Sequence, residues 1–217
     1  MLISPTHFFN NLEGKSKEEI LLIIRRLKRS ITKLKKAIEN PDLDVFFSPS
    51  NELTLKYTRE YLKLAKIALS LAGGEYKPTK AEERAEKFDE NISKISKIEF
   101  MMGSFFTGHE TRIYTICEDK VCLKIENLRS GILQDVEIDK KLFFEGLSEL
   151  YIGEWKSRYV SKKGKMVMDG IEEWHLHFYY EGGLKPFKIY GHNDFPYNYF
   201  GEFMEWLGIK QECEDEE

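Results

Sequence analysis

The last third of the chain alternates apolar and polar side chains, and this pattern constrains the fold more than any other feature. The apolar residues are Trp174, Leu176, Phe178 and Tyr180, and the polar residues between them are Glu173, His175, His177 and Tyr179. A period of two residues is typical of a strand with one buried face. Glu181-Gly182-Gly183 can form the turn, because glycine accepts the positive φ that tight turns need. The segment therefore predicts a β-hairpin, with its return strand over residues 185–190.

A run of polar residues follows this return strand. Gly191-His192-Asn193-Asp194 is expected to end the strand, and Pro196 to open a helix with an apolar face at Phe200, Phe203, Met204 and Leu207. Asn193 or Asp194 is expected to cap this helix, since both side chains accept backbone amide hydrogens. A helix N-terminus can also hold an anion, so a binding site is the alternative interpretation. The candidate binding residues are His192, Asn193, Asp194, Tyr190 and Tyr197.

The N-terminal part of the chain predicts two amphipathic helices. Ser16-Lys17-Glu18-Glu19 matches a capping box, in which a serine N-cap and a glutamate three residues later satisfy each other's backbone amides. The first helix has its apolar stripe at Ile20, Ile23, Ile24, Leu27, Ile31, Leu34 and Ile38, and Asn40-Pro41 closes it. The second helix, over residues 52–72, has its apolar face at Leu53, Tyr57, Tyr61, Leu64, Ala68 and Leu71. Two such helices joined by a loop form a helical hairpin.

The composition changes after this hairpin. Thr79 and Glu82 form a second capping box, which opens a short charged helix over residues 80–91 that we interpret as a connector. Beyond it, a strand over residues 95–102 leads into the glycine-flanked stretch Gly103–Gly108, residues 111–117 and 121–128 read as a hairpin, and residues 138–150 have helical spacing. Strands joined by short turns indicate an antiparallel sheet.

The predicted fold class is therefore α+β, with an N-terminal helical hairpin and an antiparallel sheet that packs helices on one face. The predicted organisation is a helical hairpin with its connector helix over residues 1–90, an α+β domain over 91–210 and an acidic tail over 211–217.

Composition agrees with a globular protein. Hydrophobic residues make up 41% of the 217 residues and charged residues 32%. No apolar run reaches the ~18 residues that a membrane span needs. The start of the chain, Met1-Leu2-Ile3-Ser4-Pro5, lacks the features of a secretory signal, so we expect a cytoplasmic protein without membrane contact. A disulfide between Cys117 and Cys122 is not favoured, because the cytoplasm is reducing.

The common catalytic and cofactor motifs are absent from the sequence. There is no Walker motif, no Gly-x-Gly-x-x-Gly, no Gly-x-Ser-x-Gly elbow, no His-Glu-x-x-His and no Cys-x-x-Cys. No cofactor is therefore expected, and the sequence favours a non-catalytic protein.

A metal-dependent enzyme remains an alternative. His175 and His177 lie two residues apart on a predicted strand, so both imidazoles point to one face, as in some metal sites. His192, Asp194, His109 and Asp169 could complete the ligand set. The simpler interpretation places both histidines on the hydrated face of the strand.

The first predicted helix carries the strongest local charge. Residues 15–72 contain 13 Lys and Arg residues against 7 Asp and Glu residues, although the net charge of the chain is −4. The candidate anion-binding residues are Arg25, Arg26, Arg29, Lys33 and Lys36. A basic amphipathic helix can bind nucleic-acid phosphates, but such charge runs are usually solvated faces. No Asn, Gln or aromatic residue is interleaved for base readout, so nucleic acid is an alternative partner, not the favoured one.

The C-terminal motifs also carry a resemblance. The pattern comprises Asp169-Gly170, the alternating strand from Trp174 to Tyr180, Gly182-Gly183, Tyr190-Gly191-x-Asn193 and Pro196. It resembles a loose group of uncharacterised bacterial proteins, in which a tryptophan-bearing strand and a glycine hairpin precede a Gly-x-Asn turn, a proline and a helix. The resemblance covers residues 97–207 and departs at His192, where a small residue is expected. It implies no activity.

The sequence favours an interaction protein, of the kind that serves as an immunity protein or regulator, which binds another protein or a second copy of itself. Aromatic residues near the glycine turns are typical of protein-contact surfaces.

Overall fold

The computed structural model describes residues 2–38, 49–104, 108–127, 133–160, 173–196 and 199–209. Contacts between backbone positions divide the chain into two compact units, Met1–Pro78 and Thr79–Glu217. This division assigns the connector helix to the second unit, whereas the sequence grouped it with the helical hairpin. The predicted acidic tail lies outside the described residues.

The first unit is helical. Its helices are α1 (Pro5–Asn10), α2 (Lys17–Ile38) and α3 (Asn51–Leu71). The predicted capping box is present: the backbone N of Ser16 donates to Glu19 Oε2 at 2.8 Å, and Ser16 Oγ accepts from the Glu19 N at 3.3 Å. Ile20 and Ile24 of α2 pack with Ala65 and Leu69 of α3. The predicted hairpin of two long helices is therefore confirmed.

The predicted apolar face of α3 was wrong at both ends. Leu53 and Leu71 are 45% and 76% exposed, while Leu55 and Leu69 are buried. The short helix α1, which the sequence did not predict, explains part of this difference. Its Phe8 ring stacks on Tyr61 of α3 at 4.4 Å, so α3 is covered by two helices and not only by α2.

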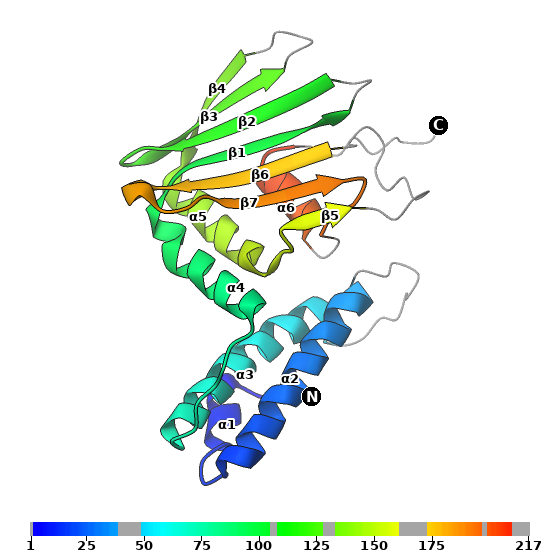
Figure 1. Ribbon diagram of the computed structural model, residues 1–217, viewed down its shortest axis with the longest axis vertical. Helices are drawn as coiled ribbons and strands as arrows, with labels where there is room; N and C mark the ends of the chain where they lie inside the picture. Colours follow the sequence, from blue (N-terminus) through cyan, green and yellow to red (C-terminus); the bar gives the residue numbers. More distant parts are fainter. Residues whose placement is uncertain are drawn as a thin grey trace. The chain divides into compact units, whose positions relative to one another are not determined.

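The second unit is built on a seven-stranded sheet. The strands are β1 (Ile95–Ser104), β2 (Gly108–Ile116), β3 (Lys120–Asn127), β4 (Leu133–Asp139), β5 (Arg158–Val160), β6 (Glu173–Tyr180) and β7 (Phe187–His192). Their order is β4-β3-β2-β1-β6-β7-β5. All neighbours are antiparallel except β5 and β7, which are parallel. Strand β6, from the C-terminal part of the chain, thus lies inside the sheet between β1 and β7 (Figure 1).

Helices cover one face of this sheet. The second unit contains α4 (Lys80–Asn91), α5 (Lys140–Glu149) and α6 (Phe200–Trp206), with short 3₁₀ turns at Ile92–Lys94, Ile152–Glu154 and Glu181–Gly183. Helices α5 and α6 lie side by side on one face of the sheet (Figure 1). Their buried Phe143, Phe200 and Phe203 join Phe100 and Trp174 of the sheet in one core. This arrangement confirms the predicted α+β fold with helices on one face.

Several element boundaries differ from the sequence-based prediction. Strand β4 was not predicted, and the helix after it begins at Lys140 and not at 138, because Asp139 Oδ1 accepts from the backbone N of Leu142 at 2.8 Å and caps it. The glycine turn was predicted correctly, since Gly182 and Gly183 have φ values of 70° and 72°. The return strand β7 begins two residues later than expected and extends to His192. Within the described residues, no helix is long and apolar enough to cross a membrane.

Candidate binding surface on the open face of the sheet

The sheet face opposite α5 and α6 carries a concentration of polar and aromatic side chains. On β1, Ile98 and Phe100 are fully buried, so Lys97 and Glu99 point to the opposite face. The same alternation on β6 and β7 places seven further side chains there: Glu173, His175, His177, Tyr179, Lys188, Tyr190 and His192. We call this the open face. Strand pairing sets Glu99 opposite His177 and Lys97 opposite Tyr179.

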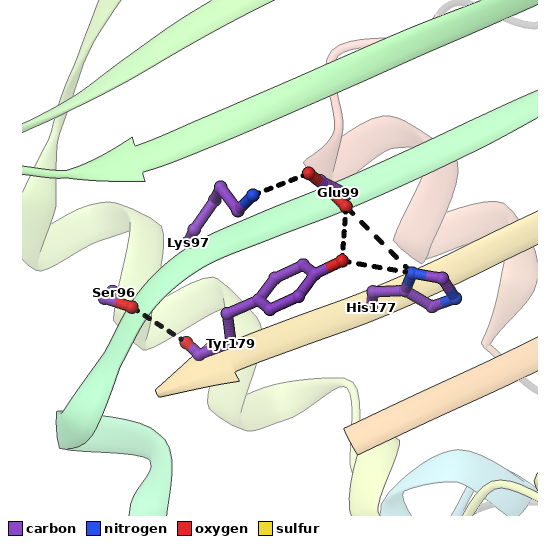
Figure 2. A network of polar contacts seen from close by, with 5 residues as sticks. All are labelled: Ser96, Lys97, Glu99, His177 and Tyr179. Carbon is purple, nitrogen blue, oxygen red and sulfur yellow. Dashed lines mark hydrogen bonds and ion pairs between the residues drawn. The ribbon is translucent and has the colours of Figure 1, made fainter. Parts of the chain in front are cut away.

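Glu99 is the centre of a hydrogen-bonded network on this face. Lys97 Nζ donates to Glu99 Oε1 at 2.7 Å, and Tyr179 Oη donates to Glu99 Oε2 at 2.6 Å (Figure 2). His177 Nδ1 lies 4.0 Å from Glu99 Oε2 and 3.5 Å from Tyr179 Oη. We call Lys97, Glu99, His177 and Tyr179 the Glu99 network. Its members come from two neighbouring strands and converge on one carboxylate.

The network fixes the charge states of Glu99 and Tyr179. Burial opposes ionisation of Glu99, but hydrogen bonds from Lys97 and Tyr179 outweigh it and hold the pKa of this carboxyl below its ordinary value. The same hydrogen bond to a carboxylate raises the pKa of Tyr179 to about 12, with burial adding to the effect. At neutral pH, Glu99 is therefore an anion and Tyr179 a neutral phenol.

His177 is a largely buried member of the Glu99 network. Its side chain is 17% exposed, and its Nε2 atom is buried with no hydrogen-bond partner among the described residues. Burial lowers the pKa of His177; the positive charge of Lys188 and the neighbouring His175 lower it further, while Glu99 opposes them. The imidazole is therefore neutral at pH 7, and its Nε2 atom can still form a hydrogen bond.

Tyr190 of β7 lies across both histidines. Its ring meets the His175 ring edge-on at 4.9 Å and the His177 ring edge-on at 5.4 Å. His175 Nε2 is also within 2.8 Å of Glu173 Oε1. Tyr190 is 37% exposed. The open face thus presents an accessible tyrosine whose neighbours hold it in place.

The structure does not assemble the predicted metal ligands. The His175 and His177 rings are 6.1 Å apart, and within the described residues no group of three His, Cys, Asp or Glu side chains is positioned to hold a metal ion. His192 lies opposite Glu173 at the end of β7, and His109 lies on β2 opposite Gly103. Asp169, the remaining predicted ligand, falls outside the described residues.

The turn after β7 has a structural explanation that differs from the predicted one. Helix α6 begins at Phe200 with Tyr199 as its N-cap and has no side-chain cap, so the prediction that Asn193 or Asp194 caps this helix was wrong. Asp194 Oδ1 accepts from the adjacent Phe195 N at 3.0 Å, and its backbone carbonyl accepts from Trp174 Nε1 at 2.9 Å. The physical reason is distance along the chain, since α6 begins four residues after Pro196 and not at it.

The predicted binding residues of this turn are therefore divided. Tyr190 lies on the open face beside the histidines, whereas Asp194 is engaged with Trp174 and Phe195. Asn193 has a positive φ of 48°, and its buried Oδ1 has no partner among the described residues. His192 is exposed, and Tyr197 lies outside the described residues.

The predicted anion-binding residues form one exposed surface on α2. All five are exposed: Arg25, Arg26, Arg29, Lys33 and Lys36. Spacings of three and four residues place Arg25, Arg29, Lys33 and Lys36 along one side of the helix. We call this set the basic stripe.

Sequence reasoning missed Glu99, which organises the open face. Its alternation with Ile98 and Phe100 was a sufficient signal for the face on which it lies. No local pattern indicated that β1 pairs with β6, more than 70 residues later in the chain. The grouping of Glu99 with His177 and Tyr179 therefore depended on strand pairing, which the sequence did not reveal.

Comparisons with protein-family models, with curated proteins and with solved structures gave no match. The resemblance to uncharacterised bacterial proteins stays a prediction, and the function has to be argued from the geometry alone.

Proposed function

We propose that the protein is a non-catalytic binding protein, and that its open face contacts a protein partner or a second copy of the chain. The observation that carries this proposal is the position of Tyr190, which is 37% exposed and held between His175 and His177. Tyrosines held in a fixed rotamer lose little entropy on binding and are enriched among the residues that dominate interfaces.

The polar groups around Tyr190 support binding by a preorganised surface. Glu99 is held by Lys97 and Tyr179, and His175 is held by Glu173, so these side chains need little reordering when a partner binds. His177 Nε2 is a buried atom without a described partner, and a donor or acceptor from another molecule would satisfy it.

The charge states of the Glu99 network favour binding over acid–base catalysis. A general acid or base works best when its pKa lies near the working pH. Tyr179 has a pKa raised to about 12, and the pKa of Glu99 is held below its ordinary value, so both are far from neutrality. The two cavities described in the second unit are lined by residues outside the Glu99 network.

The proposal is tested by comparing variants of the open face. Purified protein carrying Tyr190→Ala or Glu99→Gln is compared with the unchanged protein in quantitative affinity capture and in size-exclusion chromatography with light scattering. Glu145→Gln is the matched control, because Glu145 lies on α5 on the other side of the sheet, is paired with Lys141 and loses the same charge.

Specific loss of a captured partner, or of a dimer, in the Tyr190 and Glu99 variants supports the proposal. A partner or dimer that both variants and the Glu145 control retain equally overturns it, because the contact surface would then lie elsewhere.

The basic stripe of α2 gives a second candidate function, nucleic-acid binding. The observation in its favour is that all five cationic side chains are exposed along one helix. Binding by phosphate contacts weakens steeply with salt. The test measures retention on immobilised duplex DNA between low and high salt for Arg25→Gln/Arg29→Gln, with Lys63→Gln/Lys141→Gln as the charge-matched control. Equal retention of the two double variants would exclude nucleic-acid binding by the basic stripe.

A further inference from the structure

The second unit has a cavity that the sequence did not predict. It lies between α4 and the turn that joins β6 to β7, and its volume is about 320 Å³. Helix α4 contributes Lys80, Glu83, Arg84 and Lys87 to its lining. The turn contributes Leu184, Lys185, Pro186 and Phe187. We call this the Arg84 cavity.

Arg84 is held rigidly in the wall of this cavity. Its guanidinium lies over the Phe187 ring at 3.9 Å, and its Nη1 atom donates to the backbone carbonyl of Trp155. Both contacts fix the plane of the guanidinium, which gives it the directional geometry that suits carboxylate and phosphate oxygens.

The other terminal nitrogen of Arg84 lacks a partner. Nη2 is buried and forms no hydrogen bond with any described residue. Burial lowers the pKa of Arg84, and the phenols of Tyr159 and Tyr180 offset this lowering only in part. A buried cationic donor without an acceptor is costly, and native structures usually satisfy such groups. An acceptor in the cavity would reach Nη2 only after a rearrangement of the wall, because this atom has no exposed surface.

The charge around the cavity also favours an anion. Three lysines line it together with Arg84, and all three are exposed: Lys80, Lys87 and Lys185. Among the described residues that line it, Glu83 is the one acidic residue. An entrance lined by one sign of charge raises the local concentration of the opposite charge.

An apolar surface adjoins these cations. Leu184 is 42% exposed, although it is a large hydrophobic residue, and Pro186 and Phe187 continue the surface into the cavity. Sites for small organic ligands combine apolar walls with a few fixed polar groups. A bare inorganic ion would use Arg84 and leave Leu184 in contact with water.

We infer that the Arg84 cavity binds a small organic anion, whose carboxylate or phosphate is attracted by the Arg84 guanidinium and the three lysines and whose apolar part covers Leu184. The volume lies at the lower end of the range for small-molecule sites, so the ligand is the size of a substituted aromatic ring and not of a dinucleotide. This inference is independent of the proposed function, because it uses none of the open-face residues.

Titration calorimetry with simple probes tests the inference. Phenyl phosphate and benzoate carry the two candidate anionic groups on an aromatic ring, phenol carries the ring without the anion, and inorganic phosphate carries the anion without the ring. Saturable binding of phenyl phosphate or benzoate at unit stoichiometry is expected, at least tenfold tighter than that of phenol or inorganic phosphate. The arm that binds more tightly identifies the head group.

Three variants locate the binding. Leu184→Asp places a carboxylate at the rim of the cavity and is not expected to disturb folding, since Leu184 is partly exposed. It should weaken binding at least tenfold, as should Arg84→Met. Lys63→Gln removes a positive charge from an exposed position on α3 and should leave binding unchanged.

Two results would overturn the inference. One is the absence of saturable binding by any anionic probe at about 10 mM, which corresponds to a binding free energy too small for a formed site. The other is binding that Leu184→Asp does not weaken in protein whose circular dichroism matches that of the unchanged chain. The open-face variants Tyr190→Ala and Glu99→Gln should bind the probes normally, so failure here is distinguishable from failure of the proposed function.

Discussion

At the scale of single residues, the pKa of His177 on β6 depends on charged side chains of the neighbouring strands β1 and β7. Burial and Lys188 lower its pKa, while the carboxylate of Glu99 raises it. We expect Glu99→Gln to lower the pKa of His177 further, because the neutral amide no longer stabilises the imidazolium. Lys188→Gln should raise it. The measurement is a proton NMR titration of the His177 ring.

Glu173→Gln is the control for this titration. Glu173 contacts the neighbouring His175, whereas His177 is joined to Glu99 and Tyr179. A His177 pKa that rises in Glu99→Gln, or that moves equally in all three variants, would contradict the geometry of the Glu99 network.

Gly191 begins the polar run that the sequence suggested as a binding site, but the packing of the core requires a glycine there. It lies opposite Trp174 on β7, and a Cβ atom there would come within 1.9 Å of the Trp174 Nε1 atom. The indole is itself buried and bonded to the carbonyl of Asp194, so it cannot move freely. We expect Gly191→Ala to destabilise the second unit by about 2–3 kcal/mol, the usual cost of overpacking. Urea unfolding measures this.

Gly201 is a matched control for Gly191. It lies in α6, and no atom would meet its added Cβ within 4 Å. Gly201→Ala should therefore stabilise the protein slightly, by about 0.5 kcal/mol, because alanine loses less backbone entropy in a helix. Equal effects of the two substitutions would show that the close approach of Gly191 to Trp174 is not maintained in solution.

At the scale of elements, the sequence predicts what local periodicity encodes. The alternation in β6 and the paired glycines of its turn were predicted correctly, because both depend on neighbouring residues. Strand β4 was missed because its acidic residues, Asp135 and Glu137, made the segment resemble a loop before the helix. The start of α6 was misplaced because polar residues at 193 and 194 satisfy turn contacts in the same way as helix caps.

The β2–β3 hairpin brings two free thiols together at its turn. Cys117 Sγ lies 3.4 Å from Cys122 Sγ, and both side chains are partly exposed. The hydrogen bond between Cys122 and Cys117 raises the pKa of Cys122, so the Cys122 thiol is protonated at neutral pH. The sequence did not favour a disulfide here for reasons of compartment, and the geometry shows that the pair is close enough to be oxidised.

We expect glutathione disulfide to convert this pair into an intramolecular disulfide. One thiolate attacks the oxidant and releases glutathione, and the second thiol then displaces the other glutathione from the mixed disulfide. Because the thiolate is the nucleophile and the pKa of Cys122 is raised, the reaction should accelerate as the pH rises. Mass spectrometry of a Cys213→Ser background should show the loss of two hydrogens. When Cys122→Ser is added, glutathione should stay attached to Cys117 as a mixed disulfide. A mixed disulfide that persists in protein that still has Cys122 would contradict the prediction.

At the scale of the whole molecule, the chain divides into two units that each contain a hydrophobic cluster of their own. The cluster of the first unit is formed by Leu12 and by residues of α2 and α3, including Ile24, Ala65 and Leu69. The cluster of the second unit begins at Phe88 and extends to Leu207. Neither cluster contains a residue from the other unit. The division between Pro78 and Thr79 therefore removes no member of the larger cluster.

We predict that residues 79–217 fold without the first unit. The fragment keeps all seven strands and the capping box of α4, in which Thr79 Oγ1 accepts from the Glu82 N while Glu82 Oε2 accepts from the Thr79 N. Because the buried apolar area of its core is retained, its free energy of unfolding should be close to that of the same region in the full chain. The measurement is an amide NMR spectrum of the fragment overlaid on that of the full chain. Resonances of β1 and β6 should coincide, and a collapsed spectrum would show that the sheet needs the helical unit in order to fold.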